Sequence, residues 1–216
     1  MKVWEAMSRT PAKVTPRTPL LVARTLFRET GARVLPVVED EYSDKFTGFL
    51  TRVDVLLVTS QKSNILVKDV MRQHPIATIY DDLHDVFKIM GEFKVYGMPV
   101  VESSWNPLLK GIVTCRDIIR VLKSMGYNPK AKTVGEVMLD DNIDEMLVTL
   151  NERVNRVWSK FVYRGMPALI VVRSLDNRIP MGIVTPKDLI DHGRWFFHRE
   201  SEQHITSPAK VQRVMT

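Results

Sequence analysis

The sequence has few of the features that mark secreted and membrane proteins. Only one of its 216 residues is a cysteine, Cys115, which excludes an intrachain disulfide and favours a reducing compartment. No apolar run reaches the ~18 residues of a membrane-spanning helix. Residues 1–5 lack the apolar core of a signal peptide. These absences predict a cytoplasmic protein with no membrane span.

Signatures of catalysis are missing as well. Neither of the two common phosphate-binding loops, Gly-x-x-x-x-Gly-Lys-Ser/Thr and Gly-x-Gly-x-x-Gly, is present. His192, His198 and His204 are spaced by six residues, which does not align them on one helical face, so no metal site is expected there. No base is placed near Cys115 in the sequence. We therefore expect a protein that is not an enzyme; a catalytic role would need a further domain beyond Thr216.

The charge balance is basic but has no concentrated patch. Lysine and arginine number 31 against 25 acidic residues, which gives a net charge of +6 and a pI near 9.5. The basic residues are scattered and nowhere form a run of five or six. This distribution favours an anionic partner, for which a nucleotide is the main prediction and nucleic acid the weaker one.

One series of motifs recurs three times, in the same order. Each copy starts with an opening segment that ends in methionine, continues with a short apolar strand that contains a proline, and closes with a turn of the form Gly-h-h-Thr-x-x-Asp, where h is apolar. The opening segments are residues 3–7, 67–71 and 134–138. The strands are residues 33–38, 96–101 and 164–169. The turns are residues 48–54, 111–117 and 182–188. From methionine to proline the spacings are 29, 28 and 29 residues.

Each copy is predicted to fold as β-α-β-β-α. Apolar residues recur at i, i+3, i+4 and i+7, or on most of these positions, in the segment between the opening segment and the proline-containing strand, as in an amphipathic helix. These residues are Leu20, Ala23 and Phe27 in the first copy, Leu83, Val86, Phe87 and Met90 in the second, and Val154, Val157, Trp158 and Phe161 in the third. Gly31 is placed to end the first of these helices. The last helix of each copy is expected to start at the threonine of the turn.

The three ordered motifs closely resemble cystathionine β-synthase (CBS) domains. The resemblance covers residues 3–124 as a tandem pair and residues 133–192 as a third copy. It implies an α+β (α/β-type) fold of β-α-β-β-α units that pair about a pseudo-two-fold axis. The predicted organisation is repeat 1 at residues 1–62, repeat 2 at 63–127, repeat 3 at 128–193, a linker at 194–206 and the start of a fourth repeat at 207–216. Repeats 1 and 2 form the predicted pair.

The third repeat has no predicted partner. A single unit of this size has a marginal core, and without a pairing surface it would expose an apolar face. Residues 210–216 read as a fourth opening segment. We therefore expect a four-repeat protein, and the alternative is a three-repeat chain whose tail docks on a neighbour.

The turn of each repeat has a functional and a structural interpretation. Its threonine lies at a helix N-terminus, where free N–H groups favour an anion, and its aspartate, three residues on, suits a ribose diol. The same spacing is close to a capping box, in which the two residues satisfy each other's backbone. The candidate binding residues of the turns are Thr51, Arg52, Asp54, Thr114, Arg116, Asp117, Thr185, Lys187 and Asp188.

The strands that enter the predicted pockets supply a second set of candidates. They are Ala32, Arg33, Val34, Val95, Tyr96, Gly97, Tyr163, Arg164 and Gly165. Tyr96 and Tyr163 either stack on a purine or lie half-buried in the core. Gly97 and Gly165 would let a flat ring approach the backbone, and Val34 leaves less room. Repeat 2 therefore has the best-formed predicted pocket.

The resemblance also implies a class of ligand and a role. Relatives in this family bind AMP, ADP, ATP or S-adenosylmethionine in clefts between repeats and pass the occupancy to a regulated protein, here unidentified. They assemble as a homodimer or as an intramolecular disc of CBS pairs. The predicted function is accordingly that of a regulatory sensor of adenosine-containing ligands. The alternative is a scaffold or nucleic-acid-associated regulator with vestigial pockets.

Overall fold

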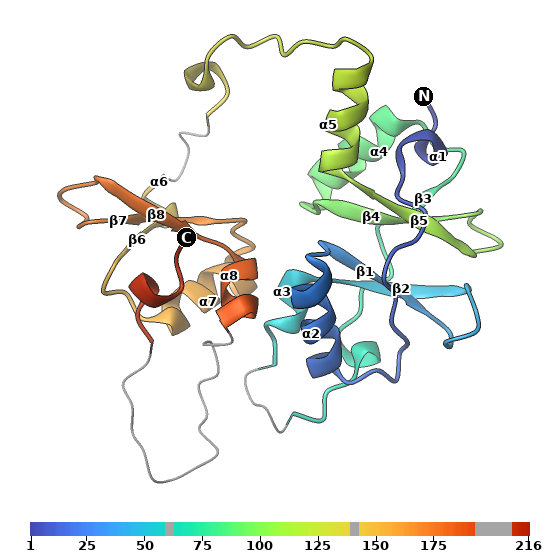
Figure 1. Ribbon diagram of the computed structural model, residues 1–216, viewed down its shortest axis with the longest axis horizontal. Coiled ribbons are helices and arrows are strands. Elements are labelled where there is room, and N and C mark those ends of the chain that lie inside the picture. The colour runs from blue at the N-terminus through green and yellow to red at the C-terminus, as the bar shows by residue number, and fades with distance from the viewer. Residues whose placement is uncertain (59–62, 139–142, 193–208) are drawn as a thin grey trace. The chain divides into compact units, whose positions relative to one another are not determined.

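The computed structural model describes residues 1–58, 63–138, 143–192 and 209–216. The predicted linker at 194–206, with His198 and His204, lies outside the described residues. The chain divides into a first unit, Met1–Thr51 with Ile65–Lys132, and a second unit, Arg52–Asn64 with Thr133–Thr216 (Figure 1). Among the described residues, no helix has both the length and the apolar character to cross a membrane.

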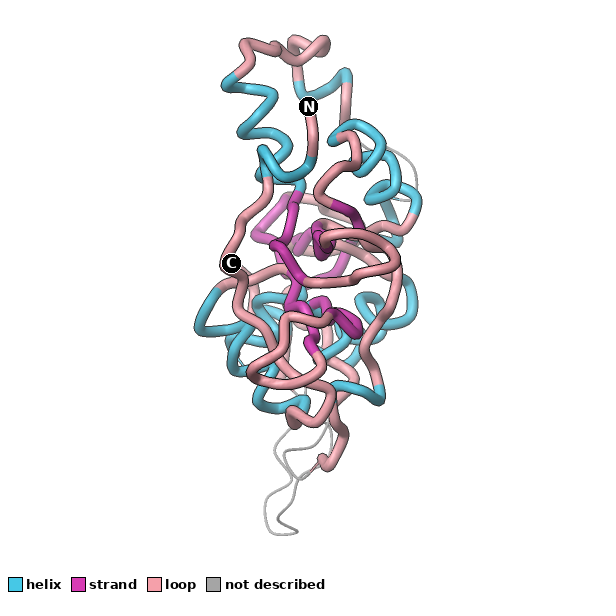
Figure 2. Tube along the Cα trace, turned by 90° about the vertical axis from the view of Figure 1, so that its right-hand side faces the viewer, coloured by secondary structure: helices cyan, strands magenta, loops and turns pink. Residues whose placement is uncertain are grey.

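Two small sheets pack face to face in the first unit. Strands β1 (Val34–Val38) and β2 (Phe46–Thr51) form an antiparallel pair. Strands β3 (Ala77–Thr78), β4 (Gly97–Val101) and β5 (Leu109–Thr114) form the other sheet, in which β3 is parallel to β4 and β4 antiparallel to β5. One buried cluster joins the sheets and consists of Val34, Val38, Phe46, Phe49, Val101 and Leu109. Figure 2 shows the strands in the middle and helices on either side.

The helices of the first unit cover the outer sides of these sheets. They are α1 (Val3–Ala6), α2 (Leu20–Thr30), α4 (Leu83–Glu92), α5 (Cys115–Ser124) and the short turn η1 (Val67–Asp69). Helix α2 ends at Gly31, whose left-handed φ of 65° confirms the predicted stop. Helix α4 buries Leu83, Val86 and Met90 but leaves Phe87 51% exposed, so its apolar stripe is narrower than the sequence suggested.

The second unit contains repeat 3, which has the same order of elements as repeat 2, together with the closing helix of repeat 1 and the C-terminal segment. Its elements are α3 (Arg52–Val55), η2 (Val134–Glu136), α6 (Ile143–Met146), β6 (Leu147–Thr149), α7 (Val154–Arg164), β7 (Leu169–Val172), β8 (Pro180–Val184), α8 (Pro186–His192) and η3 (Val211–Arg213). Strand β6 is parallel to β7 and β7 antiparallel to β8, as in the sheet of repeat 2. The indole Nε1 of Trp158 on α7 donates a hydrogen bond of 2.7 Å to the carbonyl oxygen of Leu56, just after α3.

The mixed α+β fold of repeated units is confirmed. Repeats 2 and 3 each contain the complete β-α-β-β-α order. In repeat 1 the first strand is reduced to an isolated parallel bridge between Val14 and Val37. This bridge corresponds to the parallel pair of Ala77 and Val100 in repeat 2. Repeat 1 therefore has the same topology, although its first strand is too short to be assigned as one.

In repeat 3, the strand that was predicted to contain Pro167 lies three residues later in the chain and contains no proline. Pro36 and Pro99 pair with the residue that follows the glycine of their turn, but in repeat 3 that register position holds Ile170, opposite Ile183. Tyr163, Arg164 and Gly165 do not lie on the strand, because the first two end α7 and the glycine, at φ 63°, is its C-cap. The sequence Gly-Met-Pro at 165–167 imitates that at 97–99, although Gly165 has the helix-ending role of Gly31.

Each docked opening segment lies on the sheet of another repeat, not its own. Ser8, after the first segment, pairs with Ile112 on β5 of repeat 2. Arg72, after the second, pairs with Phe49 on β2 of repeat 1, so the two repeats exchange their opening segments. At the C-terminus, the backbone N–H groups of Thr216 and Ile183 each donate to the other's carbonyl, at 2.9 Å.

A glycine underlies each docked segment. The place of a Cβ on Gly48, Gly111 or Gly182 is taken by a backbone carbonyl and a methionine sulfur of the segment. The methionines are Met71, Met7 and Met215, with Sδ at 3.0, 3.2 and 3.3 Å from the Cβ position. We call these three positions the glycine seats. The first position of each turn motif therefore requires glycine, because the backbone of the docked segment lies too close for a side chain.

Candidate functional site

The entry strands of repeats 1 and 2 meet inside the first unit. Strand β1 starts at Val34, opposite Thr51, and β4 starts at Gly97, opposite Thr114. The Cγ2 methyl of Val34 lies 3.0 Å from the place of a Cβ on Gly97. Gly97 is thus needed for the close approach of Val34, and the approach of a ligand ring to this glycine stays a prediction.

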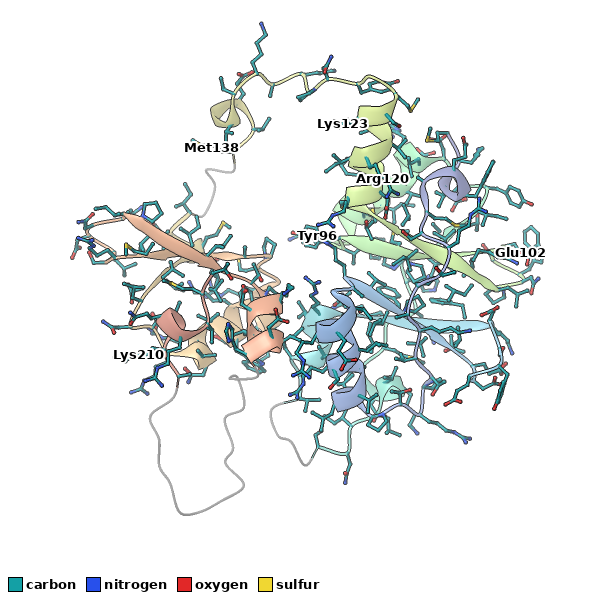
Figure 3. The ribbon with its side chains drawn as sticks, viewed as in Figure 1. Tyr96, Glu102, Arg120, Lys123, Met138 and Lys210 are labelled. Carbon is teal, nitrogen blue, oxygen red and sulfur yellow. The ribbon has the colours of Figure 1, made fainter. Side chains whose placement is uncertain are left out.

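The charge of Arg33 in repeat 1 acts on Tyr96 and on Cys115 in the turn of repeat 2. Burial raises the pKa of the Tyr96 hydroxyl, as does the nearby Cys115, while the Arg33 charge opposes this. Burial also raises the pKa of the Cys115 thiol, again against the Arg33 charge. The backbone N–H of Cys115 donates to the carbonyl of Tyr96 at 3.1 Å. The ring of Tyr96, labelled in Figure 3, remains 49% exposed.

Thr114 and Asp117 form the capping box that was the structural alternative. Asp117 Oδ2 accepts from the backbone N–H of Thr114 at 3.0 Å and from its hydroxyl at 2.6 Å. In return the Thr114 hydroxyl accepts from the backbone N–H of Asp117 at 3.4 Å. Asp117 is only 5% exposed. In this geometry the aspartate holds the start of α5, and one of its oxygens is fully engaged.

The other oxygen of Asp117 binds a residue that the sequence analysis missed. Arg120 donates from Nη2 to Asp117 Oδ1 at 2.9 Å and also reaches the carbonyl of Ala6 at 3.5 Å. Its side chain is 65% exposed, so it can leave the carboxylate at small cost. The sequence did hold a signal for this ion pair, because an arginine three residues after an aspartate lies on the same face of a helix. Arg120 therefore places a positive charge beside the carboxylate of Asp117. Figure 3 labels Arg120 on α5.

The turn of repeat 3 has the same cap, but an aspartate stands at the position that an arginine occupies in repeat 2. Asp188 Oδ2 accepts from the backbone N–H and the hydroxyl of Thr185, both at 2.7 Å, and Oδ1 accepts from Thr216 at 2.8 Å. The position of Arg120 is held by Asp191, which forms an ion pair with Lys187. Repeat 3 therefore presents two carboxylates where repeat 2 presents one carboxylate and an arginine.

The remaining candidates are distributed unevenly. Val95 is 6% exposed and belongs to the core, whereas Ala32 and Arg33 are accessible. Asp54 is buried at 5% exposure on α3. Arg52 directly follows its threonine, the place of Cys115 in repeat 2, so it does not correspond to Arg116 or Lys187.

The first unit therefore holds the more complete set of candidates. Arg33, Arg116 and Arg120 supply exposed cations, Tyr96 an accessible ring, and the Thr114 turn a helix start. Cations with an aromatic face suit an anionic ligand that carries a planar ring. Among the residues that the structure describes, no cluster of three or more metal-ligating side chains occurs.

The raised pKa of Cys115 predicts slow alkylation. Because burial favours the neutral thiol, iodoacetamide at pH 7.5 should modify Cys115 more slowly than a free cysteine, with the rate still increasing above pH 9. Mass spectrometry of timed samples measures this rate. Arg33→Ala removes the charge that opposes the shift and should slow the reaction further, while Arg9→Ala serves as the control. A Cys115 that reacts as fast as free cysteine would contradict the burial of this turn.

Comparison with known proteins adds a family match. A family profile of the CBS domain matches residues 3–60 and 67–124, more than half of the chain. Inosine-5'-monophosphate dehydrogenase from Thermoplasma acidophilum is 34% identical over 108 residues, which are 49% of this chain and 20% of that enzyme. The enzyme of the same name from Staphylococcus haemolyticus is 27% identical over 116 residues, 52% of this chain and 22% of the enzyme. The chain thus spans about a fifth of the length of these curated relatives.

Solved structures share the fold. Protein MJ1225 from Methanocaldococcus jannaschii, a proposed archaeal homologue of g-AMPK, matches 100% of this chain and 82% of its own, with a TM-score of 0.80 at 20% identity. The CBS domain pair of protein MJ0100, solved with 5-methylthioadenosine and S-adenosyl-L-methionine, matches 58% of this chain and 98% of its own, with a TM-score of 0.50 at 24% identity. CBSX2, solved with AMP, has the same coverage and identity and a TM-score of 0.51.

Proposed function

Since this chain belongs to the CBS-domain family, we propose that it is a regulatory protein that binds an adenosine-containing ligand in its first unit. The observation that carries the proposal is the meeting of the two entry strands, where Val34 of repeat 1 lies 3.0 Å from the place of a Cβ on Gly97, next to Tyr96 and opposite Thr114 of repeat 2. Two of the structurally similar CBS proteins were solved with AMP or with S-adenosyl-L-methionine and 5-methylthioadenosine. We take AMP, ADP, ATP and S-adenosylmethionine as the candidate ligands.

Each part of such a ligand has a candidate partner. The exposed face of Tyr96 offers stacking to the adenine ring, which contributes about 1–3 kcal/mol. Arg33 and Arg116 would neutralise a phosphate or face another anionic group. Asp117 would accept from the ribose hydroxyls through Oδ1, the oxygen that Arg120 now occupies. Because Arg120 is exposed, it could then turn to the phosphate.

Binding would become regulation through the arrangement of the repeats. A ligand shifts an equilibrium only when it binds one arrangement more tightly than another. Arg33 and Tyr96 come from different repeats, so a ligand on both would favour the arrangement that keeps them together. We propose that a partner protein in the cytoplasm responds to this arrangement, with the chain acting as a dimer or as a disc of CBS pairs and without catalysis of its own.

Thermal unfolding with each of the four ligands at millimolar concentration tests the proposal. A ligand at 100 times its Kd should stabilise the chain by about 2.7 kcal/mol, an upward shift of several degrees in Tm. The alternative of a nucleic-acid-associated protein with vestigial pockets predicts no shift. It predicts instead binding to DNA or RNA that weakens steeply between 50 and 200 mM salt.

A further inference from the structure

Two hairpin loops of the first unit carry aromatic side chains that lie almost fully in solvent. Tyr42, between β1 and β2, is 98% exposed, and Trp105, between β4 and β5, is 89% exposed. They are the two most exposed large hydrophobic side chains in the part of the chain that the structure describes. Since neither ring is buried, neither stabilises the fold by leaving water.

Backbone hydrogen bonds join the two loops into one surface. The N–H of Leu109 donates to the carbonyl of Asp44 at 2.7 Å, and the N–H of Phe46 donates to the carbonyl of Pro107 at 2.8 Å. Figure 1 shows both loops on the same side of the first unit, and Figure 3 labels Glu102 there. We call this surface the hairpin edge, and it consists of residues 39–45 and 102–108.

The turn that carries Trp105 does not need a tryptophan. In it, the N–H of Asn106 donates to Ser103 Oγ at 3.1 Å, and the N–H of Ser103 donates to the carbonyl of Asn106 at 3.3 Å. In repeat 3, residues 174–177 form the same two bonds, at 2.9 and 3.2 Å. The position of Trp105 is held there by Asp176. Because the same turn forms around an aspartate, the fold does not explain the tryptophan.

A tight turn fixes the loop of Tyr42 as well. Asp40 Oδ1 accepts from the backbone N–H groups of Tyr42 and Ser43, both at 2.8 Å. Ser43 Oγ accepts from the backbone N–H of Lys45 at 3.0 Å. An aromatic side chain on a fixed turn loses little conformational freedom when it binds, because few torsions remain to be ordered. Both rings are therefore suited to contact with a partner.

The hairpin edge carries an excess of carboxylates. Three of its five acidic side chains form ion pairs with lysines, at 2.7, 3.2 and 3.1 Å. The pairs are Lys13 with Asp44, Lys45 with Glu39 and Lys110 with Glu102. The other two, Asp40 and Glu41, directly precede Tyr42, so five carboxylates against three lysines leave two negative charges on a chain whose net charge is +6. This charge favours a cationic partner.

We propose that the hairpin edge binds an arginine-containing segment of a partner protein. A guanidinium group stacks on aromatic faces and is attracted by carboxylates, and the two joined loops offer both. The loops follow the ends of β1 and β4 that lie away from Val34 and Gly97, where the candidate ligand residues are. The surface is thus separate from the candidate site, and the proposal does not rest on the proposed function.

Fluorescence anisotropy with a labelled peptide of alternating arginine and serine tests the proposal. The control is the same peptide with citrulline, which is neutral, in place of arginine. At about 150 mM salt, where weak surface attraction is screened, the native chain should bind the arginine peptide saturably and the citrulline peptide much more weakly. Absence of saturable binding at millimolar peptide would overturn the proposal, as would equal binding of the two peptides.

Trp105→Asp separates stacking from charge, because it adds a carboxylate on a turn that accepts aspartate in repeat 3. Loss of a ring, in this variant or in Tyr42→Ser, should raise Kd about two- to fivefold. Tyr127→Ser, which removes a ring 63% exposed beyond α5, should leave Kd unchanged. If Trp105→Asp binds the peptide as tightly as the native chain or more tightly, charge alone attracts it and the proposal fails. A native dimer that Trp105→Asp dissociates would also overturn it, in favour of a second copy.

Discussion

Replacing Asp117 with alanine should remove adenosine-ligand binding at repeat 2 while leaving the chain folded. The carboxylate is the proposed acceptor for the ribose hydroxyls, and a hydrogen bond to a charged group contributes about 1.5–3 kcal/mol. Its loss should raise Kd at least about tenfold. The variant also loses the cap of α5, which costs about 1 kcal/mol and about 2–4 °C in Tm. Calorimetric titration and thermal unfolding measure the two effects separately.

A matched control separates the cap from the ligand. Glu136 accepts from the backbone N–H of Thr133 at 3.0 Å and from its hydroxyl at 2.8 Å, the same capping arrangement on an exposed turn. Glu136→Ala should lower the stability of the chain by a similar amount and leave the affinity for the ligand unchanged. If Asp117→Ala binds with the native affinity and stoichiometry, Asp117 is only a cap and the assignment of the ribose is wrong.

Gly111→Ala should destabilise the first unit by about 3 kcal/mol, the largest effect we expect from a single methyl group. The added Cβ would overlap the carbonyl oxygen of Ser8 and come 3.2 Å from Met7 Sδ. Ser8 cannot retreat without breaking its two backbone hydrogen bonds with Ile112, of 2.8 and 2.9 Å. Overpacking costs about 1–3 kcal/mol and each lost bond about 0.5–1.5 kcal/mol. Denaturant unfolding followed by circular dichroism measures the loss.

Gly91→Ala provides the comparison. Gly91 lies within α4, and a Cβ there would meet no atom within 4 Å. Alanine should therefore stabilise this helix by about 0.5–1 kcal/mol. A Gly111→Ala variant as stable as the native chain would mean that residues 3–8 do not dock on β5, and the exchange of opening segments would have to be abandoned.

Local patterns predicted the elements within a repeat well. The spacing of Leu83, Val86 and Met90 predicted α4, and Gly31 predicted the end of α2. The last helices also start directly after Thr114 and Thr185, as expected. These features depend on residues three or four apart, so the sequence alone carries them.

The errors came from contacts that no local pattern encodes. The exchange of opening segments joins Phe49 with Arg72 and Ser8 with Ile112, pairs 23 and 104 positions apart, and only the packed sheets show which glycine contacts which segment. Gly165 was assigned to a pocket because Gly-Met-Pro occurs twice, yet one copy ends a helix. The contact of Val34 with the place of a Cβ on Gly97 joins two repeats, and no local pattern indicated it. Arg120 was missed because its role depends on the folded position of Asp117.

The most direct test of the account is calorimetric titration of this chain with AMP, ADP, ATP and S-adenosylmethionine, at one salt concentration and with Asp117→Ala beside the native protein. The proposed function predicts saturable heat with at least one of the four, and one binding event fewer in the variant. Absence of saturable heat with all four at millimolar concentration would contradict it.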